Sequence, residues 1–521
     1  YNKITKKELN PILEFQTLSG MKSIVLLATF FLFQQVYSQE KRQAELTLTE
    51  HLNLQEVITL ARQRSTDAIL YRHQFLSAYW QYRSFRAELL PSLNLGLVAP
   101  NFSHSLVALQ NSETGEYKYV QDYAMRNSVN LSIDQNIAAT GGKVALYSSL
   151  ERLDQFEPQR YHLYNTNPVS ITYTQPIFGS FNKLKWDKKI EPEAYERAKI
   201  NYLEAMEGVT VKAVDLFFTL VSAQQKMKMA RTNYQNTEKN YRIAQERFKI
   251  GTVTQNDLMQ LELRMLNDGM TISQMETEVK TAQFELASFL GYPQSGVNFE
   301  LTLPETIPPL NLNYSDVYEL SIRNTSFKLD QKILLLRAEM AIAQAKANRG
   351  AQAEFFAQFG LNQSAAELNG SYRNPQDQEN VRLGIQIPLM DWGMGKGRVK
   401  TAQSQMNVIQ TQIKQQLTDH QQDIMIRVLQ FNNQATQCRI SEKANEVAQK
   451  RYDLSMELFK KGTLSVLEFN TAQTEKDEAV SRFITEVYNY WKYYYSLQQS
   501  TLYNFLETRN ISEDFDKLIQ N

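Results

Sequence analysis

The sequence predicts a mainly α-helical protein that also contributes strands to a transmembrane β-barrel, and it predicts two structural repeats. Three observations lead to this fold class. Apolar residues follow a sustained heptad from Met206 to Phe248, short segments such as 381–389 alternate apolar and polar residues, and a motif around Gly251 returns around Gly462. Sustained heptads indicate long coiled-coil helices, whereas alternation with a period of two indicates β-strands.

The beginning of the chain has the pattern of an export signal. Lys22 precedes an apolar run over residues 24–33, and residues 36–38 suit a cleavage near Ser38. The run is too short for a membrane-spanning helix, which needs about 20 apolar residues. A buried helix end is the alternative, and we favour a signal peptide over residues 21–38. Residues 1–20 precede Met21 and are expected to lie upstream of the native start.

Composition and motifs exclude several classes of protein. The 521 residues contain 56 basic and 56 acidic side chains, so the chain lacks the basic excess of a nucleic-acid-binding protein. The five histidines have no metal-ligand spacing, no nucleophile motif occurs, and segment 393–398 lacks the spacing of a phosphate-binding loop. Cys438, the single cysteine, is expected to be a core residue and has no partner for an internal disulfide. We therefore expect no enzyme activity, no cofactor and no metal site.

An internal repeat sets the organisation of the chain. Residues 241–252 and 452–463 share Tyr, Phe, Lys, Gly and Thr at the same spacing. We divide the chain into a first repeat over 39–295, a linker over 296–314, a second repeat over 315–505 and a C-terminal tail over 506–521.

Each repeat is expected to contain a long helical hairpin. In the first repeat the heptad predicts a helix from about Glu193 to Ile250, Gly251 ends it as a C-cap glycine, and helix resumes over 256–289. The second repeat has the same pattern, with a helix to Lys461, a break at Gly462 and a helix over 467–505.

Four segments are typical of β-strands. Residues 381–389 alternate, and nine residues is about the length of a tilted strand that crosses a membrane. Residues 355–361 are expected to pair with them, and 93–97 and 169–174 alternate in the same way. A half-buried strand of a soluble sandwich is the alternative. The export signal and the aromatic residues at the strand ends favour a transmembrane barrel with an interfacial girdle, formed by Phe178, Phe181, Trp186 and Trp392.

The strands and helices constrain each other. Two strand pairs cannot close a barrel, and open sheet edges are not tolerated in lipid. The chain must therefore share its strands with other subunits, and the long helices would continue the same tube. A further hairpin signal lies at about 124–152, around a turn at 139–142. It would either add two strands to the barrel or fold outside it, and we favour the added strands.

At this level the sequence resembles the TolC-like outer-membrane efflux protein family, over roughly residues 48–502. The resemblance is carried by the two-fold repeat, Leu-Leu-Pro-Ser-Leu at 89–93, Gln-Pro-Ile-Phe at 175–178, Ile-Pro-Leu at 387–389, Phe-Lys-x-Gly-Thr at both helix breaks and Leu-Gly-Tyr at 290–292. It implies a homotrimer, a β-barrel shared between subunits within outer-membrane lipid, and a helical tunnel in the periplasm. It also implies that a periplasmic adaptor (a membrane fusion protein) and an inner-membrane pump dock at the tunnel tip.

The resemblance further implies roles for residues near the helix breaks. Family members narrow the tunnel mouth with two acidic positions, which are Glu468 and Thr471 here. Asp257 matches the acidic partner of a basic latch residue, but the latch position itself is Leu464. We expect one cation-attracting carboxylate ring from Glu468, with a solvated helix charge as the alternative. The expected adaptor contacts lie at the two tips: Phe248, Lys249, Gly251, Thr252, Phe459, Lys460, Gly462, Thr463 and Leu464.

The predicted function is a passive exit duct in the cell outer membrane of a Gram-negative bacterium. The chain would be the channel subunit of a tripartite efflux pump or a type I secretion system. A periplasmic coiled-coil adaptor or scaffold without a barrel is the alternative. A secreted enzyme is disfavoured because no constellation of catalytic residues is visible.

Overall fold

The computed structural model describes residues 48–110, 115–157, 159–293, 297–304 and 307–520. The expected signal peptide and the segment before it lie outside these ranges. The chain divides into two compact units. Of the described residues, the helical unit contains those up to Ile69 and those within Gly208–Asn311 and Phe431–Tyr495, and the sheet unit contains those within Leu70–Glu207, Leu312–Gln430 and Ser496–Asn521.

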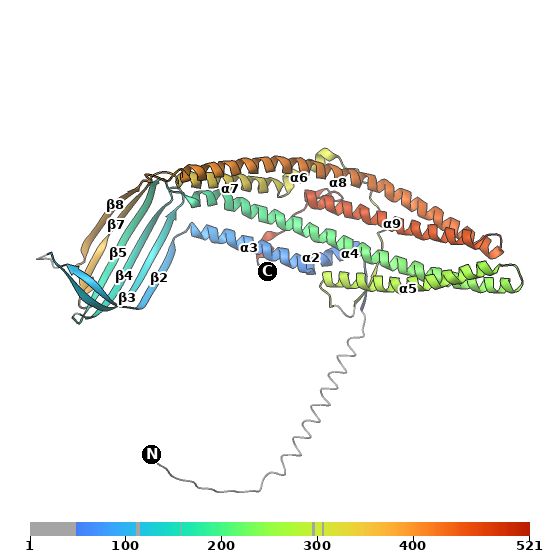
Figure 1. Ribbon diagram of the computed structural model, residues 1–521, viewed down its shortest axis with the longest axis horizontal. Helices are drawn as coiled ribbons and strands as arrows, with labels where there is room; N and C mark the ends of the chain where they lie inside the picture. The colour runs from blue at the N-terminus through green and yellow to red at the C-terminus, as the bar shows by residue number, and fades with distance from the viewer. Residues whose placement is uncertain (1–47, 111–114, 158, 294–296, 305–306, 521) are drawn as a thin grey trace, which may run out of the picture. The chain divides into compact units, whose positions relative to one another are not determined.

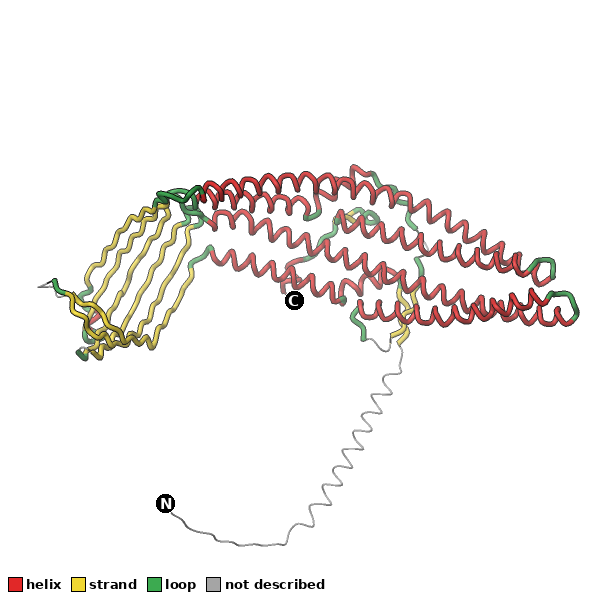
Figure 2. Tube along the Cα trace, in the orientation of Figure 1, coloured by secondary structure: helices red, strands yellow, loops and turns green. Residues whose placement is uncertain are grey.

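The sheet unit is built on one six-stranded antiparallel sheet (Figures 1 and 2). The strand order is β2-β3-β4-β5-β7-β8, so β2 and β8 form the two edges. The strands are β2 (Ser92–Gln110), β3 (Tyr117–Ile137), β4 (Gly142–Glu157), β5 (Tyr161–Phe178), β7 (Gln352–Ala365) and β8 (Gln376–Gln386).

The sheet includes every predicted strand and is larger than the prediction. The expected pairing of 355–361 with the last strand is confirmed, since Phe355 lies opposite Leu383. β8 ends at Gln386 and not at Leu389, because Pro388 has no N–H to donate to a ladder. The hairpin expected at about 124–152 corresponds to β3 and β4, and it lies inside the sheet between β2 and β5.

The helices of the sheet unit continue directly from the strands. Asn182 caps α4 by accepting a hydrogen bond from the Lys185 N–H (3.0 Å), so this helix begins at Lys183, ten residues before the predicted start, and includes Pro192. Besides its strands, the sheet unit contains these helices and several short elements. The elements are α3 (Thr66–Glu88), the first part of α4 (Lys183–Lys249), α6 (Tyr314–Asn324), α7 (Phe327–Ala347), the 3₁₀ turn η1 (Gly370–Tyr372), the first part of α8 (Met394–Lys461), β9 (Tyr503–Asn504), β10 (Arg509–Asn510) and α10 (Phe515–Gln520).

The helical unit consists mainly of two helical hairpins (Figure 1). Heptad residues of α4 form its core: Val209, Ala213 and Leu220 are at most 2% exposed. The segment predicted to be a linker contains a strand, β6, which pairs in parallel with β1. The elements are β1 (Leu48–Leu52), α2 (Leu54–Arg64), the rest of α4, α5 (Gln255–Phe289), β6 (Val297–Leu301), the rest of α8 and α9 (Val466–Thr501).

The helices of the two halves match in order and length. α2 and α6 each have 11 residues, α4 has 67 against 68 in α8, and α5 has 35 against 36 in α9. The internal repeat seen in the sequence is therefore a structural repeat. α9 ends at Thr501, four residues before the predicted end, because Leu502 adopts a left-handed conformation (φ +48°).

Candidate functional site: the sheet faces and the helix tips

One face of the six-stranded sheet is apolar and uncovered in the single chain. On β2 the side chains of Leu93, Leu95 and Leu97 are 69%, 72% and 70% exposed. The row that begins at Leu93 crosses four further strands through exposed apolar residues, namely Ile133, Leu146, Ile171 and Phe359. Water-soluble surfaces rarely leave so large an apolar area exposed, so this face suits contact with lipid or with another protein.

The opposite face of the sheet is polar. Successive residues of a strand point to opposite faces, so the row next to the apolar one lies on the other side. That row runs from β2 to β8 through Asn94, Ser132, Tyr147, Ser170, Gly360 and Gln378. A Cβ atom added at Gly360 would lie 2.9 Å from the Ser170 Cα, so the close approach of β5 and β7 requires glycine here.

The predicted interface aromatics gather where the strands meet the helices. Phe178 ends β5 and is 48% exposed, and Phe181 lies in the loop that follows. Trp186 lies within the first turns of α4, with the Lys189 ammonium 4.9 Å from its ring centroid. Trp392 lies between β8 and α8 and is 91% exposed. These aromatics therefore lie at or just beyond the strand ends, and their place at a membrane interface stays a prediction.

Both predicted helix breaks are Schellman turns. At the first, Gly251 (φ +76°) donates its N–H to the Phe248 carbonyl (3.0 Å), and Thr252 donates to the Arg247 carbonyl (3.0 Å). At the second, Gly462 (φ +81°) and Thr463 make the equivalent bonds to Phe459 and Leu458, at 3.0 and 3.1 Å. The positive φ explains why glycine recurs at both breaks, and the hydroxyls of Thr252 and Thr463 donate to the same carbonyls as their N–H groups (3.1 Å each).

The two tips differ in the exposure of their phenylalanines. Phe459 is 6% exposed and stacks on Phe469 with ring centroids 5.1 Å apart, within a buried cluster at the tips. Phe248, its sequence equivalent, is 41% exposed. The Phe459 ring is therefore buried in the single chain, whereas the Phe248 ring is open to solvent. Ile250, which that prediction did not single out, is 74% exposed.

The two acidic gate candidates occupy equivalent positions in helix caps. Glu468 is the third residue of α9, and its Oε2 accepts a hydrogen bond from Ser465 Oγ (2.9 Å). Asp257 is the third residue of α5, and its Oδ2 accepts one from Thr254 Oγ1 (2.7 Å). The bonds from Ser465 hold the pKa of Glu468 below its ordinary value. The spacing Ser/Thr-x-x-Asp/Glu is the sequence signal of a capping box, and sequence reasoning passed over it.

The other gate candidate, Thr471, is uncharged and lies in the second turn of α9. Its hydroxyl donates to the Leu467 carbonyl one turn earlier (2.9 Å), and the residue is exposed. Within the described ranges, no lysine or arginine lies at ion-pair distance from Asp257. The role of Asp257 at a tunnel mouth stays a prediction.

A cation that the sequence analysis missed joins the two tips. Arg247, on the last turn of α4, donates from Nη1 to the Phe459 carbonyl (3.3 Å) and from Nη2 to the Lys460 carbonyl. Carbonyls in the last turn of a helix lack partners within that helix, so the guanidinium gives the Lys460 carbonyl a partner and adds a second donor to the Phe459 carbonyl, which already accepts the Gly462 N–H. Arg247 also lines a cleft of about 440 Å³ together with Asp257 and Leu464. No local motif could reveal this contact, because the partners lie 212 and 213 residues apart.

A buried polar network lies between the helices behind the tips. Asp268 on α5 is 7% exposed, accepts a hydrogen bond from Thr237 on α4 (2.7 Å) and lies 3.2 Å from the Arg264 guanidinium. Burial raises the pKa of Asp268 above its ordinary value. Asn233 on α4 donates to Asp477 on α9 (2.6 Å). Such pairings hold the helices in one register, because any other register leaves buried polar groups unpaired.

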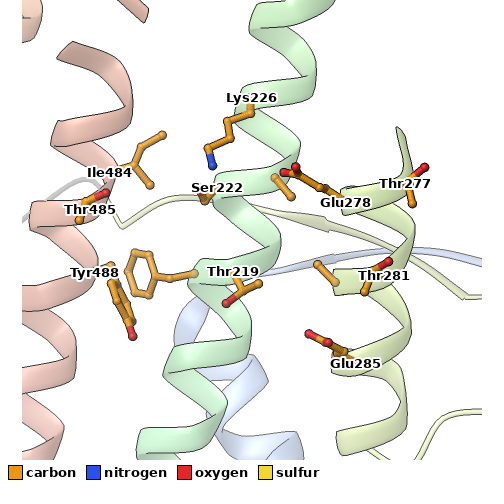
Figure 3. Close-up of a pocket in the computed structure, with 13 residues that line it drawn as sticks. Thr219, Ser222, Lys226, Thr277, Glu278, Thr281, Glu285, Ile484, Thr485 and Tyr488 are labelled. Atoms are coloured by element: carbon orange, nitrogen blue, oxygen red, sulfur yellow. The ribbon is translucent and has the colours of Figure 1, made fainter. Parts of the chain in front are cut away.

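Residues of α4, α5 and α9 line a surface groove of about 580 Å³ (Figure 3). Buried apolar residues such as Phe218 and Ala282 form its base. Lys226, Glu278 and Tyr488 come from the three different helices, and their polar groups are spread along the rim. The lining contains no histidine or cysteine and no nucleophile paired with a base, so it has the character of a surface groove.

Among the described residues, no group of three or more His, Cys, Asp and Glu is placed to hold a metal ion. No helix of the same residues combines the length and apolar character needed to cross a membrane. Cys438 is buried, and burial raises the pKa of its thiol to about 11, which suppresses the reactive thiolate.

Known proteins that are similar to this chain are outer-membrane proteins. No family model matches it. The chain is 22% identical over 338 residues to the probable outer membrane lipoprotein SilC of Salmonella typhimurium, covering 61% of this chain and 70% of that protein. The Campylobacter jejuni CmeC outer membrane channel superposes with a TM-score of 0.63 at 16% identity, covering 90% of this chain and 88% of that chain. The outer membrane protein VceC of Vibrio cholerae gives 0.59 at 13% identity, covering 88% and 97%. These likenesses establish the fold and confirm the resemblance predicted from the sequence.

Proposed function

We propose that this chain, which has the fold of the TolC-like outer-membrane efflux proteins, is an outer-membrane channel subunit. It would give a passive exit duct to a tripartite efflux pump or a type I secretion system. The observation that carries the proposal is the sheet with one exposed apolar face and one polar face. Lipid covers the apolar face of a barrel, whereas a periplasmic adaptor without a barrel would leave it in water. Similarity to the CmeC outer membrane channel supports the same choice.

The edges of the sheet support a shared barrel. β2 and β8 are edge strands of the single chain, and open edges are not tolerated in lipid. In the proposed homotrimer, β8 of one copy pairs with β2 of the next. Three copies of a six-stranded sheet supply eighteen strands, an even number within the range of bacterial barrels.

Two uncovered heptad seams in the helical unit support the same assembly. On α5, Met259, Leu263, Leu266 and Met270 follow a 4-3-4 spacing and are 58–66% exposed. On α8, Ile440, Val447 and Leu454 lie seven residues apart and are 56–59% exposed. Pairing α5 of one copy with α8 of the next would bury both seams, and repeating that contact would close a ring. The hairpins of such a ring would form the periplasmic tunnel.

The tips are the proposed docking site for a periplasmic adaptor and, through it, for an inner-membrane pump. Phe248 and Ile250 expose apolar surface there, beside the charged Lys249. Exposed turns held by a rigid scaffold are suited to recognition. Glu468, exposed at the start of α9, would supply the single carboxylate ring of the tunnel mouth.

Conductance of the purified full chain in planar bilayers tests the proposal. A channel subunit should give discrete current steps after insertion, and the protein should leave the membrane fraction only with detergent. Folded protein that washes off with salt and gives no current steps would refute the duct and favour the adaptor alternative.

A further inference from the structure

A belt of basic residues surrounds the end of the sheet where the helices begin. Four helices meet this end: α3 leads into β2, β5 leads into α4, α7 leads into β7 and β8 leads into α8 (Figure 1). The antiparallel register brings these strand ends together, since Pro176 lies opposite Glu354 and Gln352 lies opposite Gln386. The junction is therefore one continuous rim of the sheet unit.

The rim has a large positive excess. Residues 83–88, 183–189, 346–349 and 391–400 contain eleven lysines and arginines but only three carboxylates, an excess of eight (11 − 3), although the whole chain has equal numbers of each charge. All eleven cations are exposed. They are Arg83, Arg86, Lys183, Lys185, Lys188, Lys189, Lys346, Arg349, Lys396, Arg398 and Lys400, which together we call the junction belt.

Carboxylates of the rim do not neutralise this excess. Asp187 pairs with Lys183 (2.7 Å), and Asp391 caps α8 by accepting hydrogen bonds from two backbone N–H groups, at 2.9 and 2.8 Å. In the part of the chain that the structure describes, Lys185, Lys188, Lys396, Arg398 and Lys400 have no carboxylate at ion-pair distance. The first turn of α4 also lacks acidic residues, although the helix dipole favours negative charge there. The charge of the belt therefore calls for anions from outside the chain.

An exposed apolar loop connects the belt to the apolar face of the sheet. Between β8 and α8, Leu389 is 94% exposed and Trp392 is 91% exposed. Trp392 has a left-handed backbone (φ +53°), and Asp391 Oδ1 accepts the N–H of the following glycine (2.9 Å). Tryptophan beside basic side chains is typical of a membrane interface, where the ring sits at the level of the headgroups.

We propose that the junction belt and this loop bind the phosphate headgroups of anionic phospholipids in the leaflet nearest the helices. Lysine and arginine side chains contact the phosphates, and Leu389 and Trp392 enter the boundary between headgroups and acyl chains. The inference rests on the proposed membrane location and adds a lipid class to it. Each cation held near an anionic surface gains about fivefold in binding, and the gain is lost beyond a Debye length.

Lipid preference can be measured through tryptophan fluorescence in reconstituted vesicles. Full-length protein is inserted into phosphatidylcholine vesicles that contain brominated phosphatidylglycerol or brominated phosphatidylcholine, and quenching gives the relative binding constant of the two lipids. The test variant combines Lys185→Gln, Lys188→Gln, Lys396→Gln and Lys400→Gln. A matched control makes the same change at exposed lysines elsewhere on the helices: Lys228, Lys280, Lys414 and Lys450.

The wild type and the control should prefer phosphatidylglycerol, and the belt variant should lose at least about tenfold of that preference. Salt at about 1 M should abolish the preference of the wild type, because screening shortens the Debye length to about 3 Å. A belt variant that keeps the wild-type preference would overturn the proposal. So would a variant whose only change is in the ion selectivity of its current, because the cations would then face the pore.

The outcomes separate this inference from the proposed function. Phosphatidylglycerol preference without channel current would support the lipid site and refute the exit duct. Channel current without any lipid preference in the wild type would refute the lipid site and leave the duct intact.

Discussion

Replacing Leu95 with arginine distinguishes a sheet that faces lipid from one that faces water. Leu95 lies in the apolar face, opposite Leu131, and is 72% exposed in the single chain. Its neighbour Asn94 points to the polar face and already donates a hydrogen bond to the Asp134 carboxylate (3.0 Å). An arginine at position 94 would keep that acidic partner, so Asn94→Arg is the matched control.

The surroundings of Leu95 determine how much folding free energy the Leu95→Arg variant should lose. Exposed leucines at positions 93 and 97 flank it on the same face, so the arginine would stand within a continuous apolar band. On the lipid face of a barrel, arginine near the middle of the bilayer costs about 2–4 kcal/mol. In water, a substitution at an exposed site changes stability by about 0.5 kcal/mol or less. The Asn94→Arg control should change the free energy of folding by about 0.5 kcal/mol or less, in lipid and in water alike.

The free energy of folding into phosphatidylcholine vesicles, obtained from urea titration, measures this difference. Leu95→Arg should lose at least about 2 kcal/mol relative to wild type, and Asn94→Arg should lose little. Equal losses in the two variants, or a loss at Leu95 within about 0.5 kcal/mol, would mean that the apolar face does not contact lipid.

Four further predictions concern single side chains described above. Arg247→Gln should speed proteolysis at the tips, because it weakens the hydrogen bonds between the two hairpins; an unchanged cleavage rate would rule out a holding role. Glu468→Gln should lower the cation selectivity of single channels while keeping the cap, because glutamine also suits a capping box. Unchanged selectivity would leave Glu468 with only its capping role. Gly360→Ala should lower the melting temperature through its clash across the strand pair, whereas Gly384→Ala, which meets no atom within 4 Å, should not. Equal melting temperatures would contradict the close approach. Asp268→Asn should raise the melting temperature at neutral pH, because burial penalises the ionised carboxylate. That advantage should disappear as the pH falls through the raised pKa, where the wild-type carboxyl is protonated, and an advantage independent of pH would exclude this cause.

Local signals in the sequence predicted most of the fold. The positions of both helix breaks were predicted correctly, because each break depends on a local glycine, at position 251 or 462, that can adopt a positive φ. Strand pairing between 355–361 and the last strand was also correct, since alternation fixes which face each residue occupies. The early start of α4 was missed because Asn182, its N-cap, lies eleven residues before the predicted first residue.

Contacts between distant segments could not be predicted in the same way. Phe248 and Phe459 are equivalent in the repeat, yet one is exposed and the other buried, because the second tip brings the ring of Phe469 against its phenylalanine. The contact of Arg247 with the other hairpin depends on how the hairpins pack, and no spacing within either half encodes it. The capping role of Asp257 and Glu468 could have been predicted, because it depends on the local spacing Ser/Thr-x-x-Asp/Glu.

The hairpin formed by β3 and β4 bears on where a duct of this kind would resist flow. Barrel diameter grows roughly in proportion to strand number, so six strands per copy in place of four would widen the bore by about half. Sections of a tube act like electrical resistors in series, and the narrowest one limits the total current. A wide barrel would contribute little to that sum and leave most of the resistance at the helix tips. Substitutions in the bore wall would then barely change the flux, whereas small movements at the tips would control nearly all of it.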